Sequence, residues 1–200
     1  MVREQTKAEI IEATRELFCH KGFHETRMDD IVEASNTSKG TLYYYFDNKQ
    51  ELFETMINSV ISRLYQEIAK ITEKNLKVRE KLAEIIAAIA EFYQENFEFT
   101  YATFMQTGSP DPEFENQLWI WQNKFLDKTE EVIIEGIEKG FLREKDSKLM
   151  ARSFLGLTSF FGPSTIEDSY ELETLVDFVL DLYLKGVETR NDSKSKLPES

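Results

Sequence analysis

Apolar residues recur at intervals of three and four along almost the whole chain, and only four prolines and eight glycines interrupt its 200 residues. This spacing places apolar side chains on one face of a helix, whereas a half-buried strand alternates at every second residue. Hydrophobic residues make up 41% of the chain, which is enough for a packed core. The sequence therefore predicts an all-α protein.

The apolar segments are too short and too often interrupted for a membrane protein. The longest run without a charge spans the 14 residues 153–166, whereas a membrane-spanning helix needs about 18. Glutamates interrupt the first 18 residues, which argues against a signal peptide. The single cysteine, Cys19, excludes an intrachain disulfide and is typical of a reducing compartment. We therefore expect a cytoplasmic protein with no membrane partner.

The net charge is unfavourable for a simple nucleic-acid-binding protein. The 24 basic and 37 acidic residues give a net charge of −13, and DNA-binding proteins usually present a basic surface to phosphates. The acidity is uneven, because residues 1–50 hold seven basic and nine acidic residues and most of the excess lies beyond them. The charge therefore predicts weak non-specific affinity for DNA without excluding specific binding.

Residues 10–53 contain start and stop signals for several short helices. Gly22 suits the left-handed position after a first helix, and Thr26 is expected to cap a second one. Thr37 or Ser38 can cap a third helix. Two short helices joined by a tight turn form a helix-turn-helix, whose second helix enters the major groove of DNA.

The third helix, residues 41–45, and its flanks are rich in groups that contact DNA. Hydroxyls and an ammonium can bond phosphates and base edges, and a glycine lets the backbone approach closely. A long helix begins at Asn48, and a cation in its first turn adds to the attraction of helix N-termini for phosphate. The candidate DNA-binding residues are Thr26, Arg27, Ser38, Lys39, Gly40, Thr41, Tyr43, Tyr44, Tyr45 and Lys49.

The stretch from Phe18 to Leu52 resembles the N-terminal domain of the TetR/AcrR family of transcriptional regulators. The matching positions keep their order and spacing without a gap. They are Phe18, Gly22, Phe23, Thr26, Ile31, Ser38, Lys39, Gly40, Thr41, Leu42, Tyr43, Tyr45, Phe46 and Lys49. Residues 136–143 resemble the family's turn before its last two helices, and the rest of residues 54–200 matches only in length and helical character.

The resemblance implies a ligand-responsive transcriptional repressor that binds a palindromic operator as a homodimer and is released by a small apolar or amphipathic effector. It implies phosphate contacts by Thr26, Tyr43, Tyr45 and Lys49, and groove contacts by Ser38, Lys39, Thr41 and Tyr44. Packing of the three tyrosines in a core is the alternative, but three adjacent helical residues span about 200°, so at most two can point inward. Leu42 and Phe46 are expected in the core.

The expected organisation is an N-terminal three-helix helix-turn-helix domain joined by a long helix to a larger helical ligand-binding and dimerisation domain. The boundaries are residues 1–47 and 48–190, with a polar, mobile tail at residues 191–200. Helices of the larger domain are expected at residues 78–97, 99–107, 112–140 and 147–161, and from residue 172 onward.

The larger domain is rich in aromatic residues. Ordinary core packing is the alternative for most of them, but the short helix at residues 99–107 beside the break at residues 108–112 is the expected opening of an apolar pocket. The predicted effector-binding residues are Phe92, Tyr93, Phe97, Tyr101, Phe104, Met105, Trp119, Trp121 and Phe160.

The last two helices are apolar on more than one face. A lone subunit would therefore expose a larger apolar patch than soluble monomers usually tolerate. Small residues in the first of these helices permit close approach of a partner, namely Ala151, Ser153, Gly156 and Ser159. We expect a homodimer through these two helices.

No motif for catalysis or for binding a cofactor is evident, since a nucleophile elbow, a phosphate-binding loop, HExxH and an EF-hand are all missing. Cys19, His20 and His24 lie close together, but Gly22 interrupts the helix between the histidines and no fourth zinc ligand is evident. Cys19 is expected to pack at the end of the first helix, with a redox-sensing thiol as the alternative. We expect no enzyme, catalytic residue, metal or cofactor; the alternative function is a helical small-molecule-binding protein or enzyme with a vestigial helix-turn-helix.

Overall fold

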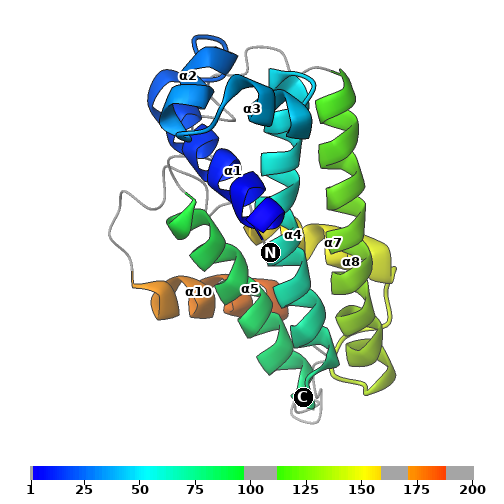
Figure 1. Ribbon diagram of the computed structural model, residues 1–200. Coiled ribbons are helices and arrows are strands. Elements are labelled where there is room, and N and C mark those ends of the chain that lie inside the picture. Colours follow the sequence, from blue (N-terminus) through cyan, green and yellow to red (C-terminus); the bar gives the residue numbers. More distant parts are fainter. Residues whose placement is uncertain (1, 97–111, 159–170, 188–200) are drawn as a thin grey trace, which may run out of the picture. The chain divides into compact units, whose positions relative to one another are not determined.

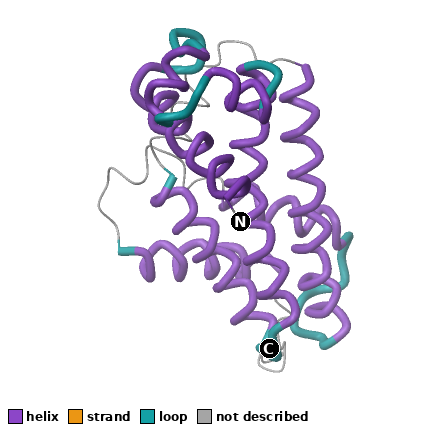
Figure 2. Tube along the Cα trace, viewed as in Figure 1, coloured by secondary structure: helices purple, strands orange, loops and turns teal. Residues whose placement is uncertain are grey.

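The computed structural model describes residues 2–96, 112–158 and 171–187, and the regular elements in these ranges are helices (Figure 1, Figure 2). This confirms the predicted all-α fold. None of these helices combines the length and the apolar character needed to cross a membrane. The helices are α1 (Val2–Lys21), α2 (Met28–Ala34), α3 (Lys39–Tyr45), α4 (Lys49–Glu73), α5 (Val78–Glu95), α7 (Pro112–Glu138), α8 (Ser147–Thr158) and α10 (Leu172–Val187).

The chain forms two compact units, each built from two stretches of sequence. Unit 1 comprises residues 1–67 and 91–122, and unit 2 comprises residues 68–90 and 123–200. Helices α4, α5 and α7 each contribute residues to both units. The division at residue 47 follows the sequence motif instead, and it stays a prediction.

The predicted turn and cap residues set most helix boundaries in the N-terminal region. Gly22 and Asn36 have positive φ values of 80° and 50°, a conformation that glycine adopts freely and asparagine tolerates. The Ser38 side chain accepts a hydrogen bond from a backbone N–H in the first turn of α3. Asn48 caps α4 in the same way, because its Oδ1 accepts from the Glu51 N–H over 2.9 Å. The predicted order of short helices is confirmed.

The predicted cap of α2 at Thr26 is wrong. Arg27 is the N-cap residue, and its backbone N–H donates to Asp30 Oδ2 over 2.8 Å. The Thr26 side chain turns inward, where it is 1% exposed and donates to the Gly22 carbonyl over 2.7 Å. Asp30 lies three residues after Arg27, the separation at which a carboxylate reaches back to the cap N–H. Asp29 has the same spacing from Thr26 but accepts a hydrogen bond from Lys39 instead.

Two buried clusters hold the first four helices together in unit 1. The N-terminal cluster takes one apolar residue from each helix and one that follows α3; it consists of Ile10, Ile31, Leu42, Phe46 and Leu52. The central cluster joins α1 to α4 and consists of Phe18, Phe53, Met56, Ile57 and Val60. The burial of Leu42 and Phe46 confirms their predicted place in the core. Helices of seven residues are unstable alone, so α1 and α4 supply the packing that keeps α2 and α3 folded.

A buried lysine connects three helices in unit 2. Lys81 on α5 is 6% exposed, and its ammonium donates to the Thr72 carbonyl of α4 and to Glu135 Oε2 of α7, both over 2.8 Å. Lys139 donates to the other carboxylate oxygen of Glu135 over 2.6 Å. The pKa of Glu135 is lowered, most strongly by the hydrogen bond from Lys139 and next by the one from Lys81.

Helices α8 and α10 pack against each other in unit 2. The Tyr183 ring lies edge-on to the Phe154 ring, with the centroids 5.1 Å apart. The Tyr183 hydroxyl donates to the Met150 carbonyl over 3.2 Å, and burial raises the pKa of this phenol well above its usual value. The two helices therefore share a buried interface.

Gly136 lies at a close approach between α7, α5 and the segment after α7. An added Cβ would lie 2.6 Å from Leu142 Cδ1 and 3.0 Å from Val78 Cγ1. Gly136→Ala is therefore expected to lower the free energy of unfolding by about 1–3 kcal/mol in urea denaturation. Gly186→Ala in α10 is the matched control, because its added Cβ meets nothing within 4 Å, and alanine favours helix. An unchanged stability of Gly136→Ala would contradict the close packing.

Several predicted features lie outside the described residues. They are the helix at residues 99–107, the break at residues 108–111, the last residues of the helix at 147–161 and the tail at residues 191–200. The predicted start of the following helix at Pro112 is confirmed by α7.

Candidate nucleic-acid interface

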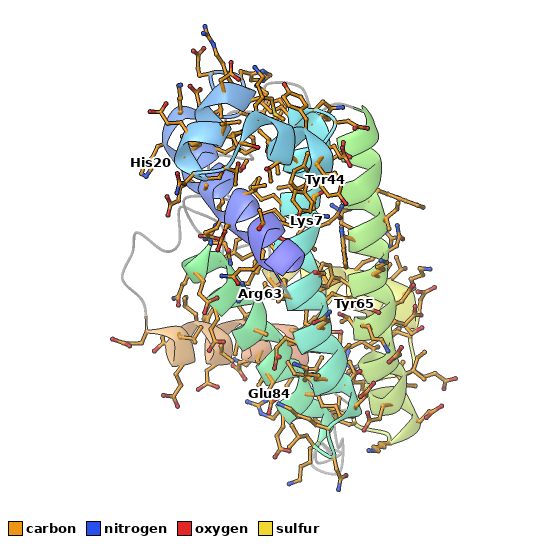
Figure 3. The ribbon with its side chains drawn as sticks, in the orientation of Figure 1. Lys7, His20, Tyr44, Arg63, Tyr65 and Glu84 are labelled. Carbon is orange, nitrogen blue, oxygen red and sulfur yellow. The ribbon has the colours of Figure 1, made fainter. Side chains whose placement is uncertain are left out.

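Helix α3 buries one face and exposes the other. Leu42 is fully buried, whereas Tyr43 is 43% and Tyr44 is 67% exposed; Tyr44 is labelled in Figure 3. Tyr45 is half-buried and packs against the N-terminal cluster. One tyrosine of the three thus faces the core and two face outward, within the limit set by helix geometry.

The first turn of α3 adds hydroxyls and a cation beside the exposed tyrosines. The Oγ atoms of Ser38 and Thr41 lie 2.8 Å apart, and the Thr41 N–H donates to Ser38 Oγ over 3.0 Å. Lys39 and Gly40 are exposed. The predicted groove contacts therefore share one short stretch of helix surface.

Sequence reasoning missed Asp29 as a partner of Lys39. Lys39 Nζ donates to Asp29 Oδ1 of α2 over 2.7 Å, and this hydrogen bond raises the pKa of Lys39. The two side chains are 63% and 72% exposed, so the pair adds little to stability. Its sequence signal is weak, because the residues lie ten positions apart and meet only once the angle between α2 and α3 is known.

Two residues at the start of α2, predicted to contact DNA, differ in accessibility. Arg27 is exposed. Thr26 is buried with its hydroxyl bonded to the Gly22 carbonyl. The Thr26 hydroxyl therefore faces the protein interior, and the phosphate contact expected of Thr26 stays a prediction.

The Lys49 ammonium, also predicted to contact a phosphate, lies against the backbone of unit 1. It donates to the carbonyls of Phe23 over 2.5 Å, Thr26 over 2.9 Å and His24 over 3.3 Å. It also lies 4.3 Å from the centroid of the Phe23 ring. Desolvation lowers the pKa of Lys49, and the Glu25 carboxylate partly opposes the shift. Three protein carbonyls thus surround the cation in the first turn of α4, and its phosphate contact stays a prediction.

Four of the predicted effector-binding residues are described, and all four belong to unit 1. Phe92 packs against the central cluster, and its ring centroid lies 5.9 Å from that of Tyr93. Burial raises the pKa of the Tyr93 phenol, whereas Trp119 is 63% exposed. The predicted residues outside the described ranges are Phe97, Tyr101, Phe104, Met105 and Phe160.

Trp121, the fourth, connects α7 to α4. Its Nε1–H donates to Asn58 Oδ1 over 2.7 Å, and its ring centroid lies 5.9 Å from that of Tyr65, which Figure 3 labels on α4. Sequence reasoning missed Asn58. The available signal was an amide that lies between apolar residues of α4 at positions 57 and 60.

In the described ranges, no three His, Cys, Asp or Glu side chains gather in a way that could hold a metal ion. Cys19 packs, partly buried, against the central cluster. The environment of Cys19 is thus that of an apolar packing residue.

Helices α2 and α3, the turn between them and the exposed polar face of α3 define a helix-turn-helix DNA-binding protein. Residues 10–56 match the model of the bacterial regulatory proteins of the tetR family, and residues 75–161 match the tetracyclin repressor-like C-terminal domain. The chain therefore belongs to the TetR family of transcriptional regulators, as the resemblance of residues 18–52 predicts.

Individual relatives extend the match over most of the chain. The chain is 29% identical over 175 residues to the transcriptional regulator QacR of Staphylococcus aureus, covering 83% of this chain and 91% of the relative. It is 20% identical over 185 residues to a fatty acid metabolism regulator of Bacillus subtilis, covering 91% and 95%. The structure of FadR from Bacillus subtilis in complex with stearoyl-CoA is similar with a TM-score of 0.78 and 20% identity, covering 90% of this chain and 98% of that one. This similarity confirms the fold.

Proposed function

We propose that this regulator is a dimeric repressor that binds a palindromic operator and is released by an acyl-coenzyme A or a similar amphipathic effector. The exposed face of α3, with Tyr43 and Tyr44 outward and Leu42 inward, carries the DNA-binding part of the proposal. Family membership favours it over a small-molecule-binding protein or enzyme with a vestigial helix-turn-helix. A regulator of chromosomal DNA works in the cytoplasm, where we place it.

The accessibility of the side chains supports a division of roles at the DNA. Exposed hydroxyls and cations can bond phosphates and base edges in the major groove. We assign these contacts to Arg27, Ser38, Lys39, Thr41, Tyr43 and Tyr44, and we propose that Gly40 lets the backbone approach DNA closely.

The outer faces of α8 and α10 support dimerisation through these helices. Leu149 of α8 and Phe178 and Leu182 of α10 are 63%, 64% and 50% exposed. Phe178 and Leu182 lie four residues apart and share one face of α10, and an exposed apolar face is typical of an interaction surface. A second copy of the chain covers them in our proposal. The dimer then presents two copies of α3 to successive major grooves, about 34–36 Å apart.

Two observations support an acyl-coenzyme A as the effector: the ligands of relatives and the aromatic residues of unit 1. The solved relative holds stearoyl-CoA, and a curated relative is a fatty acid metabolism regulator. Phe92, Tyr93 and Trp121 supply aromatic surface, and aromatic side chains are typical of the walls of ligand sites. An effector that disturbs the bond between Trp121 and Asn58 would act directly on α4, the helix that follows the DNA-reading elements.

Tyr44→Ala tests the reading surface. The side chain is 67% exposed, so its loss is expected to leave the fold intact while it weakens operator binding by about 1–3 kcal/mol. Gel shifts on the DNA that flanks the gene measure the affinity. Gln66→Ala, an exposed position on α4, is the control and should bind as the wild type does. Equal affinity of Tyr44→Ala and wild type would remove Tyr44 from the interface, and absence of salt-sensitive binding to any DNA would overturn the proposed function.

A tryptophan titration tests the effector. Trp119→Phe leaves Trp121 as the single tryptophan, and its indole N–H is bonded to Asn58. Acyl-CoAs of increasing chain length are expected to change Trp121 emission and to release the operator over the same concentration range, because both readouts report one binding event. Free coenzyme A is the control. Release of DNA without a change in emission would contradict Trp121 as part of the site, and no response to any acyl-CoA would overturn the effector class.

A further inference from the structure

The hydrogen bonds of Lys49 use every donor that its ammonium has. A lysine ammonium carries three N–H groups and no acceptor. Three backbone carbonyls lie at 2.5, 2.9 and 3.3 Å from Nζ. A DNA phosphate could bind this group only by displacing one of these carbonyls.

All three carbonyls belong to the segment that joins α1 to α2. Phe23 and His24 follow Gly22, whose positive φ ends α1, and Thr26 directly precedes the N-cap residue Arg27. Lys49 is the first residue of α4. Its side chain therefore connects the start of α4 to a point 23–26 residues earlier, where the chain enters the helix-turn-helix.

Phe23 and Thr26 make further contacts that hold the segment between α1 and α2. The Phe23 ring lies under the ammonium and packs edge-on or tilted against Phe18 and Phe53 of the central cluster. The Thr26 hydroxyl donates to the Gly22 carbonyl. Two kinds of contact thus hold the segment: apolar packing of Phe23 and the interaction of its ring with the Lys49 cation.

We propose that Lys49 is a positioning residue, which fixes the segment between α1 and α2 to the start of α4 and so sets the orientation in which α3 meets DNA, instead of binding a phosphate itself. This inference rests on the proposed function of DNA binding. It also specifies how a movement of α4 reaches the reading surface, because the first residue of α4 holds the entry to α2.

Substitution by arginine separates the two roles. Arg keeps the positive charge and binds phosphates well, but its planar guanidinium cannot direct its donors at three carbonyls around one point. Lys49→Arg is therefore expected to bind the operator at least tenfold more weakly than wild type, with an unchanged dependence of affinity on salt. A phosphate contact predicts the opposite: Lys49→Arg would bind as wild type does.

Lys49→Met and Lys39→Met provide the matched comparison. Methionine keeps an unbranched chain and removes the charge. Loss of a lysine that meets DNA lowers the salt slope by about one, which we expect for the exposed Lys39 and not for Lys49. A salt slope reduced by about one in Lys49→Met, together with normal binding by Lys49→Arg, would overturn the proposal.

Amide hydrogen exchange tests the same inference without DNA, so its failure is distinguishable from failure of the proposed function. The Thr26 N–H donates to Gly22 O and the Arg27 N–H to Asp30. In Lys49→Met, and in Lys49→Arg if the methionine variant does not fold, peptides covering residues 22–28 are expected to exchange at least tenfold faster. Lys39→Met should leave that exchange rate unchanged. Unchanged exchange in a folded Lys49 variant would overturn the proposal even if DNA binding is impaired.

Discussion

Replacing Phe46 with alanine is expected to lower the free energy of unfolding of unit 1 by about 3–5 kcal/mol. The Phe46 side chain is 1% exposed and belongs to the N-terminal cluster, to which α1, α2, α3 and α4 each contribute. Its ring also lies 5.4 Å from Lys7 Nζ on α1. Because short helices depend on such packing, we expect the loss of α2 and α3 as stable helices, and with them the loss of operator binding.

Urea denaturation followed by circular dichroism and by exchange of amides in residues 28–45 measures this effect. Tyr43→Ala is the matched control, since it also removes an aromatic ring near the end of α3 but from a side chain that is 43% exposed. It is expected to cost far less stability while still weakening DNA binding. A loss below about 1 kcal/mol for Phe46→Ala would mean that the cluster collapses around the missing ring.

Replacing Glu135 with leucine is expected to lower the free energy of unfolding by about 3 kcal/mol, because the ammonium of Lys81 is left buried without its carboxylate. Lys81 is 6% exposed, and among the described residues it would retain the Thr72 carbonyl as its one hydrogen-bond partner. Lys81→Met is expected to cost less, since Glu135 is 25% exposed and keeps its bond to Lys139. Equal losses in both single variants would contradict this account.

The double variant Lys81→Met with Glu135→Leu isolates the burial of charge. Replacing both members of a buried pair with apolar residues of similar size is often close to neutral. We therefore expect the double variant to recover most of the stability that Glu135→Leu alone loses. Urea denaturation of the four proteins gives the coupling free energy directly, and additive losses would show that the two side chains do not interact.

The same pair predicts a dependence of stability on pH. The pKa of Glu135 in the folded protein lies below its usual value of 4.5, so its contribution is present above that pH and is lost as the pH falls through the folded pKa. The difference in unfolding free energy between wild type and the double variant should therefore become less favourable to wild type below about pH 4.5. A difference that stays constant from pH 7 to pH 3 would contradict the assignment.

Features of the fold that depend on neighbouring residues could be predicted from the sequence. Gly22, Asn36, Ser38 and Asn48 act within one turn of helix, through backbone φ or a hydrogen bond to a residue three positions away. The apolar spacing that hides Leu42 is equally local. These signals were sufficient to place the helix-turn-helix and its exposed face.

Roles that depend on distant partners could not be predicted in this way. Lys49 bonds a carbonyl 26 residues earlier, and Trp121 bonds an amide 63 residues earlier. A sequence gives the chemistry of such side chains but not the groups that surround them. Both were therefore expected to meet DNA or an effector, and both have a partner inside the protein.

The ion pair between Lys39 and Asp29 bears on how the regulator searches a chromosome. On a surface that meets DNA, an attached carboxylate competes with every phosphate for the same ammonium. Random sequence adds no base contacts that favour the phosphate, whereas the proposed operator adds base contacts and binds both subunits of the proposed dimer. If Lys39 meets DNA as proposed, the Asp29 carboxylate lowers its affinity for the phosphates of random sequence, and the regulator is then expected to spend less time at sites other than the operator.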